Sequence, residues 1–290
     1  MTKNTYDKIY KWLLLIPLAI LLFSVVYLYN FNNQNGDLIL KDVSLTGGTT
    51  VTVLDDNTNI EDLRSFLGER FEDSNVRGIS NIRTGRQQGF FVETAAEPEE
   101  ITSVLEEYLG YELDGENSSI EFSGASLSQG FYQQLRLAIL FAFIFMAIVV
   151  FLVFRSTIPS LAVILSAFAD IVMTLTVVNL LGMRLSSAGI IAFLMLIGYS
   201  VDTDILLTTR VLKKKSVSIN ARIYDAFKTG FTMTLTSIVA VAISLIVIFN
   251  FSEALRQIFT VLLIGLGFDI MNTWFANASI LKWYAHRRER

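Results

Sequence analysis

Cysteine is absent from this 290-residue chain, and histidine occurs once. Without cysteine there is no disulfide framework, no thiolate metal site and no thiol nucleophile. The single His286 lies in a basic tail, which favours a solvated terminus over a metal ligand. Any chemistry must therefore use carboxylates, hydroxyls, amides, lysine or arginine. We expect no metal, no other cofactor and no enzymatic activity.

Charged residues are also scarce, at 17% of the chain against 52% hydrophobic residues, and the mean hydropathy is +0.51. A soluble domain of this length is rarely so apolar. A bilayer core needs about 20 apolar residues in a helix. Six stretches meet that requirement, and they span residues 12–29, 137–154, 158–181, 187–208, 230–249 and 255–284. The composition therefore predicts an α-helical membrane protein with six transmembrane helices.

The six stretches are unevenly spaced. The first, residues 12–29, is too long for a signal-peptide core and no small-residue cleavage site follows it, so we interpret it as a retained anchor. The other five form one block, residues 135–284, with short connections. Residues 30–134 are rich in charge and turn residues and must fold outside the hydrocarbon. We therefore expect a 1+5 arrangement with one inserted domain.

The orientation follows from lysine and arginine, because short loops rich in them stay in the cytoplasm. Lys3, Lys8 and Lys11 precede the first stretch, so residues 1–11 are expected inside, and six spans return residues 285–290 to that side. The same alternation places further basic residues inside: Arg155, Arg210, Lys213, Lys214, Lys215, Arg222 and Lys228. The loops on the other side hold Arg184 and Arg256. The predicted location is the cell membrane, with the inserted domain extracytoplasmic.

The inserted domain is acidic. Residues 31–134 contain 19 acidic and 6 basic residues, a net charge of −13. Such a surface disfavours nucleic acid and anionic lipid headgroups, so we expect no nucleic-acid partner. The charge fits either solubility in an acidic or salty exterior or a basic protein partner.

Within this domain the sequence pattern alternates between strand and helix periods. Strands are predicted at 49–53, 76–82, 89–94 and 118–122, and amphipathic helices at 60–71 and 97–109. The second and third strands are expected to form a hairpin. The order β-α-β-β-α-β is typical of a ferredoxin-like α+β domain, a small sheet with two helices on one face. That order indicates a fold and no chemistry.

Carboxylates occur inside the predicted spans, where a charge costs several kcal/mol unless it faces protein or water. Asp170 lies roughly 18 Å along its helix at 1.5 Å per residue, near the bilayer midplane. Asp202 and Asp204 are two positions apart, about 200° around a helix, so they cannot both face the same way. Asp269 lies near the middle of the last span.

A lysine and several hydroxyls accompany these carboxylates. Lys228 enters the fifth span, and a hydroxyl run that includes Thr232 follows it. The predicted set of proton-relay or intramembrane polar residues is Asp170, Asp202, Asp204, Asp269, Lys228 and Thr232. Such a set can relay protons or ions, or it can serve as polar contacts between packed helices.

Paired intramembrane carboxylates also occur in aspartyl proteases of the membrane, where like charges share a proton. Those enzymes resemble one another in a Gly-x-Gly-Asp element. Here Gly265 and Gly267 are followed by Asp269 one residue late, and the Tyr224-Asp225 pair falls in a predicted loop. The protease interpretation is therefore disfavoured.

The string Leu-Ile-Gly-Tyr-Ser-Val-Asp-Thr-Asp at residues 196–204 resembles the Gly-Tyr-Ser element of the SecF family of protein-export membrane proteins. Similar elements occur at Gly47-Gly48-Thr49, at residues 123–127, around Asp170 and at Thr236-Ser237. Residues 262–274 resemble the archaeal branch. The resemblance covers essentially the whole chain.

The resemblance implies a SecD-like partner in a heterodimer of the resistance-nodulation-division (RND) type, near the SecY channel. The implied work is assisting an exported polypeptide, with protons moving through carboxylates in the bilayer. Bacterial members generally have Asn-Asp-Thr where this chain has Asp202-Thr203-Asp204, and Arg where it has Thr232, with Lys228 one turn earlier. The alternatives are a self-contained RND-type transporter subunit and a structural scaffold for the channel.

Overall fold

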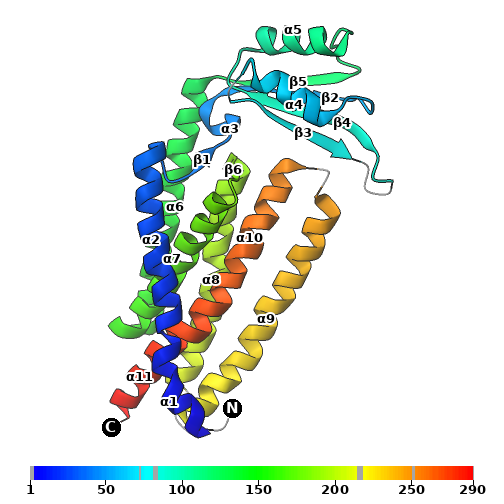
Figure 1. The fold of residues 1–290 in the computed structure, drawn as a ribbon. Helices are drawn as coiled ribbons and strands as arrows, with labels where there is room; N and C mark the ends of the chain where they lie inside the picture. Colours follow the sequence, from blue (N-terminus) through cyan, green and yellow to red (C-terminus); the bar gives the residue numbers. More distant parts are fainter. Residues whose placement is uncertain (1–2, 72, 81–83, 214–217, 250–251, 290) are drawn as a thin grey trace.

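The structure is a computed structural model that describes residues 3–71, 73–80, 84–213, 218–249 and 252–289. It consists of a long helical bundle with a small sheet at one end (Figure 1). Both chain termini lie at the other end of the bundle, away from the sheet. Lys214 and Lys215, assigned above to a loop, lie outside the described residues.

The bundle contains α1 (Lys3–Leu13), α2 (Leu15–Asn35), α6 (Ala125–Phe154), α7 (Thr157–Leu180), α8 (Ser187–Lys213), α9 (Ile219–Ile248), α10 (Glu253–Met271), the π-helix η1 (Asn272–Asn277) and α11 (Ala278–Arg288). Six helical segments of the described chain are long and apolar enough to cross a membrane, with α10, η1 and α11 forming one of them. The prediction of a helical membrane protein is confirmed. Helices α6 and α9 begin well before the apolar stretches at 137 and 230, because a helix can continue into water beyond the hydrocarbon.

The helices differ in how much the protein buries them. The percentages refer to the apolar 18-residue segment of each helix. In that segment 61% of α7 and 56% of α8 is buried, against 11% of α6 and 6% of α9. Helices α7 and α8 therefore form the interior of the bundle together with α10, which packs against both. Helices α6 and α9 turn most of their apolar surface outward.

Close packing between helices of the bundle depends on glycine. A Cβ at Gly230 of α9 would lie 2.6 Å from Cζ2 of Trp274, and one at Gly265 of α10 would lie 2.5 Å from two methyl carbons of Leu196. A rigid indole ring has less room to move than the flexible end of a leucine. Gly230 therefore sets the distance between α9 and the π-helix.

We expect Gly230→Ala to destabilise the chain by about 1–3 kcal/mol, because the added methyl group overpacks the contact with Trp274. The measurement is thermal unfolding of the purified protein in detergent. Gly267→Ala is the matched control, since a Cβ at Gly267 meets no atom within 4 Å. Equal unfolding temperatures for both variants would contradict the proposed contact.

The sheet contains β2 (Gly48–Val53), β3 (Asn75–Ser80), β4 (Gln87–Thr94) and β5 (Ser118–Ser123) in the order β3-β4-β2-β5, with every neighbouring pair antiparallel. Helices α4 (Ile60–Gly68) and α5 (Pro98–Leu109) cover the face turned away from the bundle (Figure 1). Asn59 caps α4 by accepting a hydrogen bond from the amide of Glu61 at 3.0 Å. The predicted second strand extends to Ile82, which lies outside the described residues.

The core of this small domain is apolar and fully enclosed. Its buried side chains are Val51, Val53, Leu63, Leu67, Val76, Phe90, Val92, Ile101 and Leu105. Strand residues alternate between this core and the opposite face, as the period of a strand requires.

A short parallel pair of strands, which the sequence pattern does not indicate, ties the sheet domain to the bundle. Strand β1 (Leu40–Lys41) comes just before α3 (Val43–Thr46). It pairs with β6 (Arg184–Leu185), which lies in the connection between α7 and α8. Arg184 Nη1 donates to the carbonyl oxygen of Asp73 at 3.0 Å. Asn179 Nδ2 donates to the carbonyl oxygen of Leu38 at 2.8 Å. Three segments distant in sequence thus meet at this junction, residues 38–41, Asp73 and residues 179–185.

Two acidic side chains are buried at the same junction. Burial raises the pKa of Glu93, and the nearby charge of Asp42 raises it further, although Asn75 Nδ2 donates to Glu93 Oε2 at 2.9 Å. Burial also raises the pKa of Asp42. The folded state therefore holds these protons more tightly than the unfolded chain does.

We expect Glu93→Gln to stabilise the sheet domain at neutral pH. Because the folded-state pKa of Glu93 lies above its value of 4.5 in the unfolded chain, the stability present at low pH is lost as the pH rises through the folded-state pKa. Glutamine does not ionise, so the variant keeps that stability as the pH rises. Hydrogen exchange of β4 amides in the full chain between pH 5 and 8 measures it, with the exposed Glu121→Gln as control. A wild-type pH dependence retained in Glu93→Gln would refute the assignment.

Candidate functional site

Three carboxylates from three helices meet inside the bundle. Asp170 comes from α7, Asp204 from α8 and Asp269 from α10, and their exposed fractions are 0%, 0% and 1%. Each helix presents its carboxylate to the interior because α7, α8 and α10 pack against one another there. The arrangement is an acidic site enclosed by protein rather than lipid.

Asp170 accepts two short hydrogen bonds. Ser200 Oγ of α8 donates to Asp170 Oδ2 at 2.5 Å, and Asn272 Nδ2 of the π-helix donates to Asp170 Oδ1 at 2.6 Å. Both carboxylate oxygens are therefore held by donors from other helices. The Asp170 side chain links α7 to α8 and to the last span.

The other two carboxylates share a hydroxyl. Thr203 Oγ1 lies 3.2 Å from both oxygens of Asp269. Thr273 Oγ1 lies 3.2 Å from Asp269 Oδ1 and 2.9 Å from Asp204 Oδ1, so it stands between the two carboxylates. Asn277 Nδ2 donates to Asp204 Oδ1 at 2.7 Å.

A series of polar contacts, which passes through the backbone of Ser200, connects the three carboxylates. Ser200 contacts Asp170 through its hydroxyl, and its backbone carbonyl accepts from Thr203 Oγ1 at 3.0 Å. From Thr203 the path runs through Asp269 and Thr273 to Asp204. We call this set of residues the acidic network: Asp170, Ser200, Thr203, Asp204, Asp269, Thr273, Asn272 and Asn277. On α9, Thr234 Oγ1 lies 3.5 Å from Asp269 Oδ2, at the edge of the network.

The π-helix is what directs both amides to the network. Asn272 and Asn277 are five residues apart, which in an α-helix would place them roughly 140° from each other. A π-helix makes i→i+5 hydrogen bonds, so its residues i and i+5 lie on one face. The wider turn from Asn272 to Asn277 therefore lets one amide reach Asp170 and the other reach Asp204.

The network has no cation among the described residues. The donors to its carboxylates are hydroxyls and side-chain amides, and one oxygen of Asp204 and the carbonyl oxygens of Asn272 and Asn277 are buried without a donor. Three buried negative charges without a cation are electrostatically costly. The site is therefore chemically suited to hold a proton on one carboxyl, and Thr273 lies where it can pass a proton between Asp269 and Asp204.

The structure gathers some of the predicted site residues and separates others. Asp170, Asp204 and Asp269 lie together, whereas Asp202 lies on the exposed face of α8, as the 200° separation from Asp204 requires. Lys228 and Thr232 are exposed on α9, where Thr232 Oγ1 donates to the carbonyl oxygen of Lys228 at 2.8 Å.

Sequence reasoning missed the hydroxyls of Ser200, Thr203 and Thr273 as members of the site. The signal was present in the spacing, because residues 200, 203 and 204 are i, i+3 and i+4 on one helical face. No group of three or more histidine, cysteine, aspartate or glutamate side chains suited to a metal ion occurs in the described part of the chain.

The bundle, with polar groups enclosed among its apolar helices, defines a helical, multi-pass membrane protein. A family model described as the protein-export membrane protein SecD/SecF, C-terminal, matches residues 104–287. The protein-export membrane protein SecF of Methanocaldococcus jannaschii is 42% identical over 96% of both chains. SecF of Methanothermobacter thermautotrophicus is 39% identical over 97% of this chain and 94% of its own.

This chain belongs to the SecF family of protein-export membrane proteins. The resemblance inferred from residues 196–204 is thus confirmed, and so is a role in protein export. The relatives are membrane subunits of protein export rather than enzymes, which confirms the prediction that the chain is not an enzyme.

A solved structure shares the fold. The crystal structure of SecDF from Thermus thermophilus, a translocon-associated membrane protein, superposes with a TM-score of 0.73 at 19% identity and covers 97% of this chain. SecDF in a super-membrane-facing form gives a TM-score of 0.56 at 20% identity. This chain spans 38% of the length of either SecDF chain.

Proposed function

We propose that this chain is the SecF-like accessory subunit of the Sec translocase, acting with a SecD-like subunit beside the SecY channel to assist polypeptide export. The proton gradient drives this action through the acidic network. One observation carries the proposal: Asp170, Asp204 and Asp269 are buried together and connected by hydroxyls, with no cation among the described residues to neutralise them.

Proton transfer in the network would change helix packing. A carboxyl that gains a proton becomes a hydrogen-bond donor, so its contacts with Ser200, Thr203 and Thr273 must rearrange. Because these residues link α7, α8 and α10, the rearrangement shifts the balance between helix positions. Helices α7 and α8 continue into the connection that holds β6, which carries the shift to the sheet domain.

The topology that we propose agrees with the observed element order. Residues 30–134 form an extracytoplasmic, ferredoxin-like domain, supported by the strand order β3-β4-β2-β5 and two helices on one face. One span precedes it and the five-helix block 135–284 follows. Residues 1–11 and 285–290 are cytoplasmic, supported by the position of both termini at the end of the bundle away from the sheet.

An exposed acidic residue supports a partner of similar build. Asp202 lies on the outer face of α8 in line with Met195 and Tyr199, whose exposed fractions are 39% and 44%. A carboxylate facing lipid near the bilayer centre costs about 2.5–3.5 kcal/mol. A second bundle covering this face would remove that cost, and a SecD-like subunit supplies one.

The experiment is export of a reporter protein in cells depleted of this chain, with and without a proton gradient, together with isolation of the tagged chain from its membrane. We expect the chain to restore gradient-dependent export and to bring with it a SecD-like subunit. Isolation as a homodimer with no such subunit would contradict the proposal and favour a self-contained RND-type transporter. Restored export that does not depend on the gradient would contradict the proton coupling but not the role as an accessory subunit.

A further inference from the structure

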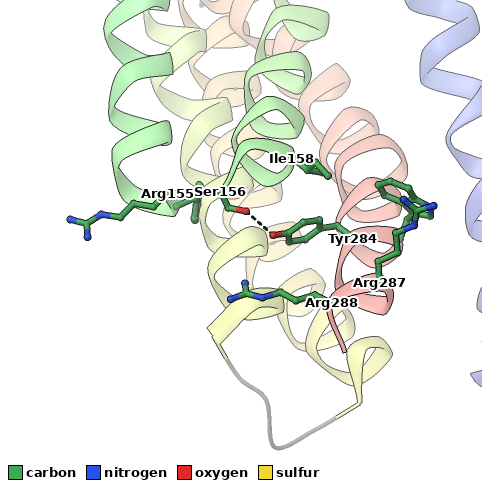
Figure 2. A pocket seen from close by; sticks show the side chains of 8 residues that line it. Arg155, Ser156, Ile158, Tyr284, Arg287 and Arg288 are labelled. Atoms are coloured by element: carbon green, nitrogen blue, oxygen red, sulfur yellow. Dashed lines mark hydrogen bonds between the residues drawn. The ribbon is translucent and has the colours of Figure 1, made fainter. Parts of the chain in front are cut away.

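A pocket of about 470 Å³ opens between the α6–α7 turn and α11, at the end of the bundle away from the sheet (Figure 2). Pockets that hold small molecules measure about 300–1,000 Å³. Its lining consists of Phe154, Arg155, Ser156, Ile158, Trp283, Tyr284, Arg287 and Arg288. A hydrogen bond of 2.7 Å between the hydroxyls of Ser156 and Tyr284 joins the two walls.

The pocket carries positive charge without an acidic residue in its lining. In Figure 2 Arg288 lies below the Ser156–Tyr284 pair, Arg287 lies on the far side of Tyr284, and Arg155 extends outward from the turn. Within the described residues none of the three arginines forms an ion pair, and the neighbouring Glu289 binds Arg222 instead. Uncompensated guanidinium groups around a cavity favour an anion, and a phosphate group matches their geometry best.

The backbone of the turn adds to this preference. Arg155 ends α6 with φ 47°, a left-handed conformation that glycine adopts more readily. The Ser156 hydroxyl does not cap α7, because it is bonded to Tyr284. The first turn of α7 therefore has no side-chain cap from Ser156, and the positive end of the α7 dipole lies beside the pocket.

The pocket lies where hydrocarbon gives way to headgroups. The turn at Arg155 and Ser156 joins the ends of two candidate membrane spans, one ending at Phe154 and the next beginning at Thr157. Trp283 stands under the guanidinium of Arg287 at 4.5 Å, and aromatic side chains of this kind mark membrane interfaces.

An apolar groove runs along α6 toward this turn. It is lined by Phe143, Ile144, Ala147, Ile148, Phe151 and Leu152. Ala147, Phe151 and Arg155 are spaced by four residues and so share one face of the helix. An acyl chain in the groove would therefore end at Arg155.

We propose that the pocket binds the phosphate headgroup of an anionic membrane lipid, with an acyl chain lying along α6. The shared chemistry is the anionic phosphate group, which inorganic phosphate also carries. The groove favours the lipid, because inorganic phosphate has nothing to place there.

The test is native mass spectrometry of the full chain in detergent, titrated with phosphatidylglycerol, phosphatidylcholine or inorganic phosphate. We expect retention of phosphatidylglycerol over phosphatidylcholine, and a loss of affinity on the order of tenfold or more in the double variant Arg155→Gln, Arg288→Gln. The double variant Lys8→Gln, Lys11→Gln removes two exposed charges at the same end of the bundle and should bind as wild type does.

Three results would overturn the assignment. Equal retention of the two lipids would show that the pocket does not recognise the charge of the headgroup. Equal losses in both double variants would reduce the effect to net charge. Displacement of phosphatidylglycerol by millimolar phosphate would assign the pocket to the free ion.

Discussion

Replacing Asp170 by asparagine is expected to reduce export to the level seen without a proton gradient, while the chain still binds its partner. Asparagine has nearly the same size and keeps the contacts with Ser200 and Asn272 at 2.5 and 2.6 Å within reach. It cannot take up or release a proton. The same loss is expected for Asp269→Asn, since Asp269 lies between the hydroxyls of Thr203 and Thr273.

The control for this prediction is Asp202→Asn. Asp202 is on the exposed face of α8, outside the acidic network, so its substitution should leave the gradient-dependent part of export intact. Reporter export with and without an uncoupler, at normal expression, is the measurement. Unchanged export in Asp170→Asn, Asp204→Asn and Asp269→Asn would mean that these carboxylates are polar contacts between packed helices.

Gly198→Leu is expected to abolish co-isolation of the SecD-like subunit. Gly198 lies on the exposed face of α8 beside Tyr199 and Asp202, and a Cβ there meets no atom of the chain within 4 Å. Small residues let membrane helices approach closely, so a leucine at such a point separates them. Isolation of the tagged variant, with quantification of the bound subunit, measures the effect.

The same variant carries its own control for folding. Because the site of Gly198 is open within the chain, the unfolding temperature of the isolated Gly198→Leu protein should equal that of wild type. Gly198→Ala should retain most of the partner. A Gly198→Leu chain that keeps its full complement of the SecD-like subunit would place the interface elsewhere.

Much of this architecture could be predicted because it depends on local information. Span length and hydropathy are properties of about 20 consecutive residues, so all six membrane helices were identified. The same holds for β2, whose β-branched run at 49–53 favours a strand in any context. Helices α6 and α9 begin before the apolar stretches at 137 and 230, since hydropathy reports the hydrocarbon boundary and not the end of the helix.

The rest depends on long-range packing. The β1–β6 pair has two residues in each strand, too few for a periodic pattern, and its partners are more than 140 residues apart. The π-helix is composed of residues that fit an α-helix equally well, and the amide contacts with Asp170 and Asp204 arise in the packed bundle. Geometry showed that Asp202 and Asp204 diverge, but the choice of Asp204 for the interior required the neighbouring helices.

The β1–β6 pair also has a mechanical consequence. Strand β1 lies between α2 and the sheet, so a load on the sheet along the bundle axis reaches α2 through the covalent chain. The pairing with β6 adds a non-covalent route, into the α7–α8 hairpin that carries Asp170 and Asp204. Routes in parallel divide the force, and the share borne by β6 pulls directly on the helices that carry Asp170 and Asp204.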